Sequence, residues 1–98
     1  MADTTTADTA PTTAEDCFEL GMIHASGRDG AVDLVTAHMW FNIAASRGHQ
    51  DAAQQRREIA AQMADAEIGT AQRAARDWLK AHPIAAVDAP APALRIAA

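Results

Sequence analysis

Alanine occupies 26 of the 98 positions, and this abundance restricts the possible folds more than any other feature of the chain. Alanine has the highest helix propensity, and its small side chain lets helices approach closely. Tyrosine is absent, and β-branched residues are sparse beyond the threonines near the N-terminus, which argues against a β-sheet. Only 22 larger apolar residues remain to form a core, too few for a deep cofactor cavity. The sequence therefore predicts one small all-α domain.

Four helical segments are indicated by the apolar spacing and by residues that begin or end helices. We expect them at about 14–26, 33–47, 50–63 and 66–81. Thr12 or Thr13 can cap the first segment and Asp33 the second, while Pro83 stops the last. Because short loops connect successive segments, we expect an antiparallel arrangement of two αα-hairpins.

The two ends of the chain differ in composition from the predicted helical domain at 13–82. Residues 1–12 have no apolar period, and residues 83–98 are rich in alanine and proline, so we expect both tails to be disordered. No signal-peptide pattern and no apolar run of about 18 residues is found. We therefore expect a cytoplasmic protein that has no contact with membranes.

The formal net charge is −5, and the negative charge gathers near the N-terminus. Residues 1–33 hold seven acidic residues and one basic residue, whereas residues 34–98 hold six acidic and seven basic residues. A domain that binds duplex nucleic acid usually carries a strong positive excess, so we do not expect such a partner. Arg73, Arg76 and Lys80 form one helical stripe, for which we expect a solvent-facing role. A contact with an acidic partner or a nucleic acid is the alternative.

No residue pattern typical of catalysis, of a metal site or of a cofactor site is found. The single cysteine, Cys17, is expected to be a small buried apolar residue, because a catalytic thiol would need a nearby base. His24 and His38 could approach each other across the first hairpin as a weak metal site. The favoured interpretation is that His24 takes an aromatic position and that His38 and His49 face solvent. The sequence thus predicts no enzyme, no metal and no cofactor.

Ten residues between 20 and 52 follow a regular spacing without a gap. They are Leu20, Gly21, Gly27, Asp33, Ala37, Trp40, Ala44, Ala45, Gly48 and Ala52. This pattern resembles that of the Sel-one-like repeat family, a relative of the tetratricopeptide repeats, and is similar to small bacterial members with a single repeat. In physical terms, Gly21 lets two helix backbones approach closely, while Leu20 and Trp40 are expected to fill the space between the paired helices.

The chain departs from the family pattern at several positions. His24 stands where the family has an aromatic residue, and Arg56 and Arg57 stand where a second repeat would have Leu-Gly. We therefore expect a repeat hairpin at 13–49 and a degenerate capping hairpin at 50–82, whose last helix closes the core.

The resemblance implies a non-catalytic adaptor or regulatory protein that binds a peptide or helix of an unidentified protein partner in a helical groove. The partner-binding residues that it assigns are Glu15, Phe18, Glu19, Met22, Gln54 and Glu58. Phe18 and Met22 lie four residues apart and share a face, as an apolar anchor would. The alternative for this pair is the core, covered by the N-terminal tail or by the fourth helix. A self-assembling module or weak homodimer, and a small nucleic-acid-associated regulator, are the alternative functions.

Overall fold

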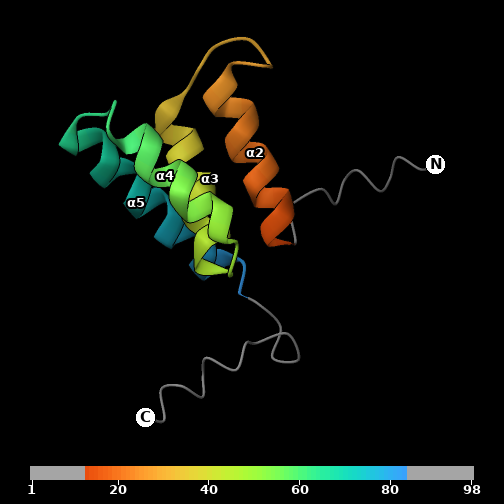
Figure 1. Cartoon of the computed structure of the whole chain (residues 1–98). Coiled ribbons are helices and arrows are strands. Elements are labelled where there is room, and N and C mark those ends of the chain that lie inside the picture. The colour runs from red at the N-terminus through yellow and green to blue at the C-terminus, as the bar shows by residue number, and fades with distance from the viewer. Residues whose placement is uncertain (1–12, 84–98) are drawn as a thin grey trace.

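The computed structural model describes residues 13–83, which form four α-helices (Figure 1). These are α2 (Ala14–Ser26), α3 (Leu34–Ser46), α4 (Gln50–Ala60) and α5 (Asp65–Ala81). The predicted all-α class and the four helices are confirmed, with bounds that agree within about one helical turn. Apart from Pro83, the tails predicted at 1–12 and 83–98 lie outside the described residues.

The first two helices begin at capping residues that the sequence indicated, and α3 ends at Ser46, one residue before the predicted end. Thr13, rather than Thr12, caps α2, because its Oγ1 accepts a hydrogen bond from the Asp16 amide at 3.0 Å. Asp33 caps α3 by accepting from the Thr36 amide at 3.0 Å. Gly27 ends α2 in the left-handed conformation, with φ of 75°, which a residue with a side chain rarely adopts. These local signals fix the α2–α3 pair.

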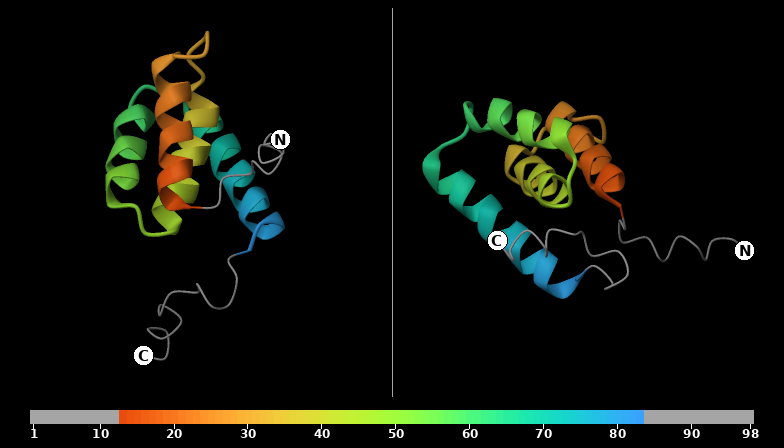
Figure 2. Two further views of the ribbon diagram at one scale, coloured as in Figure 1. Left: turned by 90° about the vertical axis from the view of Figure 1, so that its right-hand side faces the viewer. Right: turned by 60° about the horizontal axis from the view of Figure 1, so that its bottom comes forward.

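Helix α3 is the centre of the molecule. Helices α2, α4 and α5 each pack against α3, whereas α4 and α5 have little contact with each other. The right-hand view of Figure 2 shows α3 enclosed by the other three, with α4 and α5 diverging from their connection. The predicted second pair is therefore not a packed hairpin. The apolar side chains of α5 instead cover α3, which is apolar on most sides and offers the larger surface to bury.

The core lies along α3. Its largest fully buried side chains are Phe41, Ile43 and Cys17. Gly21 of α2 faces Phe41 so closely that a Cβ built on Gly21 would lie 2.5 Å from two ring carbons. Gly21 was predicted to let two helix backbones approach closely, but its neighbour is the Phe41 ring, which fills the space that a side chain on Gly21 would take. Ala71 and Ala75 of α5 are also buried, so the last helix closes the core as expected.

No helix within residues 13–83 is long and apolar enough to cross a membrane.

Candidate functional site

Phe18 and Met22, the predicted apolar anchor, are half-buried and pack against the core. The Phe18 ring lies between two other rings, with its centroid 5.8 Å from that of Phe41 and 4.2 Å from that of His49. This position matches the core alternative. His49 covers one face of the Phe18 ring. The N-terminal tail, which the sequence offered as a cover, lies outside the described residues.

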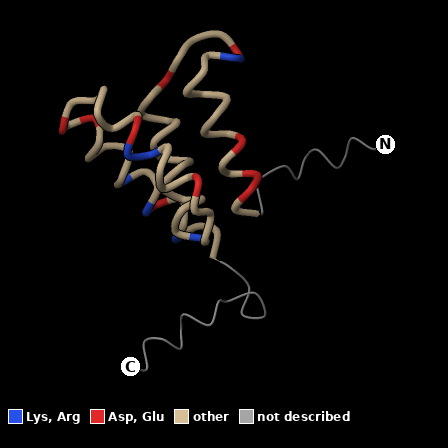
Figure 3. The backbone as a smooth tube through the Cα atoms, viewed as in Figure 1, with Lys and Arg blue, Asp and Glu red and all other residues tan. Residues whose placement is uncertain are grey.

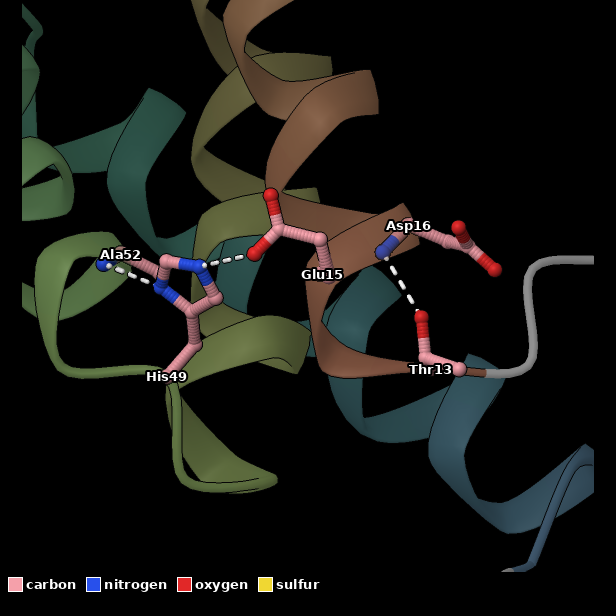
Figure 4. Close-up of polar contacts among 5 residues, drawn as sticks. All are labelled: Thr13, Glu15, Asp16, His49 and Ala52. Atoms are coloured by element: carbon pink, nitrogen blue, oxygen red, sulfur yellow. Dashed lines mark hydrogen bonds and ion pairs between the residues drawn. The ribbon is translucent and has the colours of Figure 1, made fainter.

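His49 links the start of α4 to α2 (Figure 4). Its Nδ1 accepts a hydrogen bond from the Ala52 amide at 3.1 Å, and its Nε2 lies 3.0 Å from Glu15 Oε1. Because Nδ1 accepts, the proton of the neutral ring is on Nε2, which donates to the Glu15 carboxylate. The prediction that His49 faces solvent is therefore wrong, since its side chain is only 13% exposed. The His49 ring stacks on Phe18 and covers a face of that ring which the core leaves open.

The remaining residues of the predicted groove form separate pairs. Glu19 approaches Arg28 at 3.8 Å, and Gln54 lies 3.5 Å from Glu58 along α4. Within residues 13–83, no hydrogen bond, ion pair or aromatic contact joins the α4 pair to Phe18 or Met22. The contacts of these residues thus link Glu19 to the α2–α3 loop and the α4 pair to each other.

His38 was also expected to face solvent, and this prediction is wrong. It is 2% exposed, because α3 is enclosed on several sides, and its Nδ1 has no hydrogen-bond partner in the described part of the chain. Burial lowers the pKa of His38, and the positive charge of Arg56 lowers it further. His38 is thus held as a neutral core residue. No group of three His, Cys, Asp or Glu side chains among residues 13–83 is placed to hold a metal ion.

Cys17 is fully buried, as predicted, and burial raises the pKa of its thiol. A raised pKa keeps the sulfur protonated and unreactive. The thiol is therefore a packing group.

An aromatic cluster fastens the end of α5 to α3. Trp78 meets Trp40 edge-on at 5.4 Å and stacks on His82 at 4.0 Å. The Arg47 guanidinium lies 5.2 Å from the Trp78 ring centroid, and it donates to the His82 carbonyl. Trp40 therefore packs against the last helix, whereas Leu20 is half-buried and lies outside the core cluster. The cluster is structural because its rings cover one another.

The predicted basic stripe on α5 faces solvent. Arg73, Arg76 and Lys80 are all exposed, as expected, and the exposed Asp77 lies among them. This mixture of signs is typical of a solvated helix face.

A cleft of about 690 Å³ lies at the N-terminal end of α3, where the α2–α3 loop approaches the beginning of α5. Its apolar lining includes Val32, Leu34 and Val35, and its acidic lining consists of Asp29, Asp33 and Glu67. We call these six residues the acidic cleft. The sequence analysis assigned none of them to binding.

Val32 distinguishes the acidic cleft from the rest of the described surface. It is 56% exposed and is the one large apolar side chain within residues 13–83 that is classed as exposed. Its Cγ2 lies 3.0 Å from the position that a Cβ on Gly27 would take, so the glycine leaves room for the valine. A valine within the polar loop 27–33 was the available sequence signal.

The carboxylates of the acidic cleft are held in place by helix starts. Both oxygens of Asp33 accept from Thr36, and these hydrogen bonds lower the pKa of Asp33, which keeps it ionised. Glu67 accepts from the Ala64 amide at 2.9 Å at the beginning of α5. Figure 3 shows acidic positions on the α2–α3 loop and at the start of α5, with the basic positions of α5 further along it.

No family model matches this chain, and comparison with curated proteins and with solved structures found no match.

Proposed function

We propose that this chain is a non-catalytic protein-interaction domain, and that its docking surface is the acidic cleft. The partner is a short segment with one apolar side chain that packs on Val32 and a neighbouring Lys or Arg that faces the carboxylates. The exposure of Val32 is the observation that carries the proposal, because the other large apolar side chains of residues 13–83 are at least half-buried.

The energetic argument favours a short linear segment over a broad interface. Full burial of a valine side chain contributes about 1.5–3 kcal/mol, and Val32 has about half of its surface left to bury. Exposed ion pairs add about 1 kcal/mol or less each. These contributions are consistent with weak, reversible docking whose selectivity comes from charge.

The repeat type is part of the same proposal. The α2–α3 pair agrees with a Sel-one-like hairpin in its cap at Asp33, its turn at Gly27 and the close approach at Gly21. The α4 and α5 helices then act as a cap that completes the core around α3. A lone repeat of this kind presents its loops as well as its helix faces, and the acidic cleft combines the α2–α3 loop with the starts of α3 and α5.

Site-specific photo-crosslinking in cells tests the proposal. A photoreactive amino acid replaces Val32 in one variant and Gln54, from the groove that the family resemblance predicted, in another. We expect a protein adduct from position 32 and none from position 54, with the crosslink mapped to an apolar residue next to Lys or Arg. Asp29→Lys should reduce the adduct several-fold, because the charge of the exposed loop is reversed. An adduct from position 54 alone, or none from position 32, would overturn the proposal.

A further inference from the structure

The acidic cleft combines three carboxylates with an exposed valine, and its lining contains no Lys or Arg, although His24 lines it beside Asp33. Asp29, Asp33 and Glu67 line the same cleft as Val32, and the nearby Arg28 is directed to Glu19 at 3.8 Å. An occupant that matches this surface must bring a cation and an apolar group within a few residues of each other.

One segment of this chain has that chemistry. Outside residues 13–83 the sequence contains a single basic residue, Arg95, and its neighbours are Leu94 and Ile96. The other large apolar residues beyond Pro83 are Ile84 and Val87, and Val87 is followed by Asp88, whose charge would be repelled by the carboxylates. Charge complementarity therefore selects Leu94–Ile96.

The segment is long enough to reach the acidic cleft of its own chain. Glu67 lies in the cleft near the start of α5, and His82 follows directly after that helix. The 15 residues between them correspond to roughly 22 Å along the helix axis. Residues 83–94 span up to roughly 40 Å when extended. The linker thus covers the distance with length to spare.

We propose that Leu94–Ile96 docks in the acidic cleft of the same molecule and competes with the partner segment. The side chain of Leu94 or Ile96 packs on Val32, and Arg95 faces Asp29, Asp33 and Glu67. This inference rests on the proposed function, because it assumes that the acidic cleft is a docking surface. A tethered segment has a local concentration of the order of millimolar, so weak docking is enough to fill the site. A partner must displace it, which lowers the apparent affinity for the partner.

Methyl NMR of the full chain tests this occupancy directly. The chain has only three valines, Val32, Val35 and Val87, so a spectrum with labelled valine methyls is simple to assign. We expect the Val32 methyl signals to shift in the Leu94→Ala/Ile96→Ala variant and in Arg95→Glu. The matched control, Ile84→Ala/Val87→Ala, removes two apolar residues from the same segment and should leave Val32 unchanged. Equal shifts in the variants and the control, or no shift in any of them, overturn the inference.

Two further readouts separate the possible outcomes. A Val32 shift that disappears on dilution, together with a dimer mass in light scattering, would assign the occupant to a second copy and overturn intramolecular docking. Adding the peptide Ala-Pro-Ala-Leu-Arg-Ile-Ala-Ala to the Leu94→Ala/Ile96→Ala variant should return the Val32 signals toward their original positions.

The crosslinking experiment separates this inference from the proposed function. Leu94→Ala/Ile96→Ala should raise the partner adduct at position 32 at least twofold. An unchanged adduct would overturn docking of Leu94–Ile96 in the acidic cleft but not the proposed function. The absence of any adduct at position 32 would overturn the proposed function.

Discussion

The contact between Gly21 and Phe41 is the tightest residue-scale constraint in the α2–α3 pair. A methyl group at Gly21 would fall 2.5 Å from the Phe41 ring, well inside van der Waals contact. Phe41 is fully buried, and because protein cores are close-packed its ring cannot move aside without displacing its neighbours. The absence of a side chain at Gly21 therefore sets the separation between these two helices.

Gly21→Ala and Gly69→Ala form a matched pair of variants in helices. At Gly69 the nearest neighbour of an added Cβ is the flexible end of Arg73 at 3.5 Å, so nothing must move. We expect Gly69→Ala to stabilise the domain by about 0.5–1 kcal/mol through helix propensity. Gly21→Ala should destabilise it by about 1–2 kcal/mol, because overpacking outweighs that gain. Urea unfolding measures both, and a stabilised Gly21→Ala would contradict the packing described here.

Sequence reasoning succeeds at residues whose role is steric or local and fails at residues whose role depends on distant neighbours. The sequence identified Cys17 as a buried residue and Gly21 as a position without room for a side chain, although the neighbour of Gly21 is the Phe41 ring and not a helix backbone. His38 and His49 were assigned to solvent because histidine is polar. His38 is buried because three helices enclose α3, and His49 is buried because its ring stacks on Phe18. Both depend on residues distant in the sequence, so no local pattern indicates them.

At the scale of elements, each helix begins with a different capping device. Thr13, Asp33 and His49 accept from the backbone at the starts of α2, α3 and α4. Glu67 reaches back to the Ala64 amide at the start of α5. These local devices explain why the helix boundaries could be predicted within about a turn. The angle between α4 and α5 could not be predicted. A short loop does not determine the direction of the helix that follows it, nor whether the apolar face of that helix packs on α4 or on α3.

His49 tests how much one cap contributes to α4. His49→Ala removes the acceptor for the Ala52 amide and the stack on Phe18, and we expect a loss of about 2 kcal/mol. His49→Asn keeps a capping acceptor and should lose about 1 kcal/mol less. Chemical unfolding gives the two values, and hydrogen exchange at the Ala52 amide reports the cap itself. Equal losses for both variants would show that the stack alone matters.

At the scale of the whole molecule, α3 makes the fold a single cooperative unit. Every other helix packs on α3, and little contact joins the others to one another. A substitution or a change of protonation within α3 therefore alters the global free energy of unfolding. The buried His38 is a residue where this applies. The acidic cleft, in contrast, lies at one end of α3, and its exposed residues Asp29 and Val32 belong to the α2–α3 loop and not to the core.

The buried His38 predicts that stability falls on mild acidification. Its pKa is lowered in the folded state from about 6.5 in the unfolded chain, so the unfolded state binds more protons between the two values. The contribution of neutral His38 to the free energy of unfolding is therefore fully present above about pH 6.5, and it is lost as the pH falls below this value. His38→Gln should flatten the dependence between pH 5 and 7, where carboxylates change little. Urea midpoints across this range are the measurement, and identical slopes would contradict the prediction.

The complete burial of Cys17 makes its thiol a reporter of how often the fold opens. The chain has one cysteine, its sulfur lies between α2 and the centre of the fold, and its raised pKa slows any attack while it is enclosed. A thiol-specific dye can react only in molecules in which α2 has separated from α3. The rate at which the dye labels Cys17 in native buffer therefore reports how often α2 separates from α3, without a denaturant.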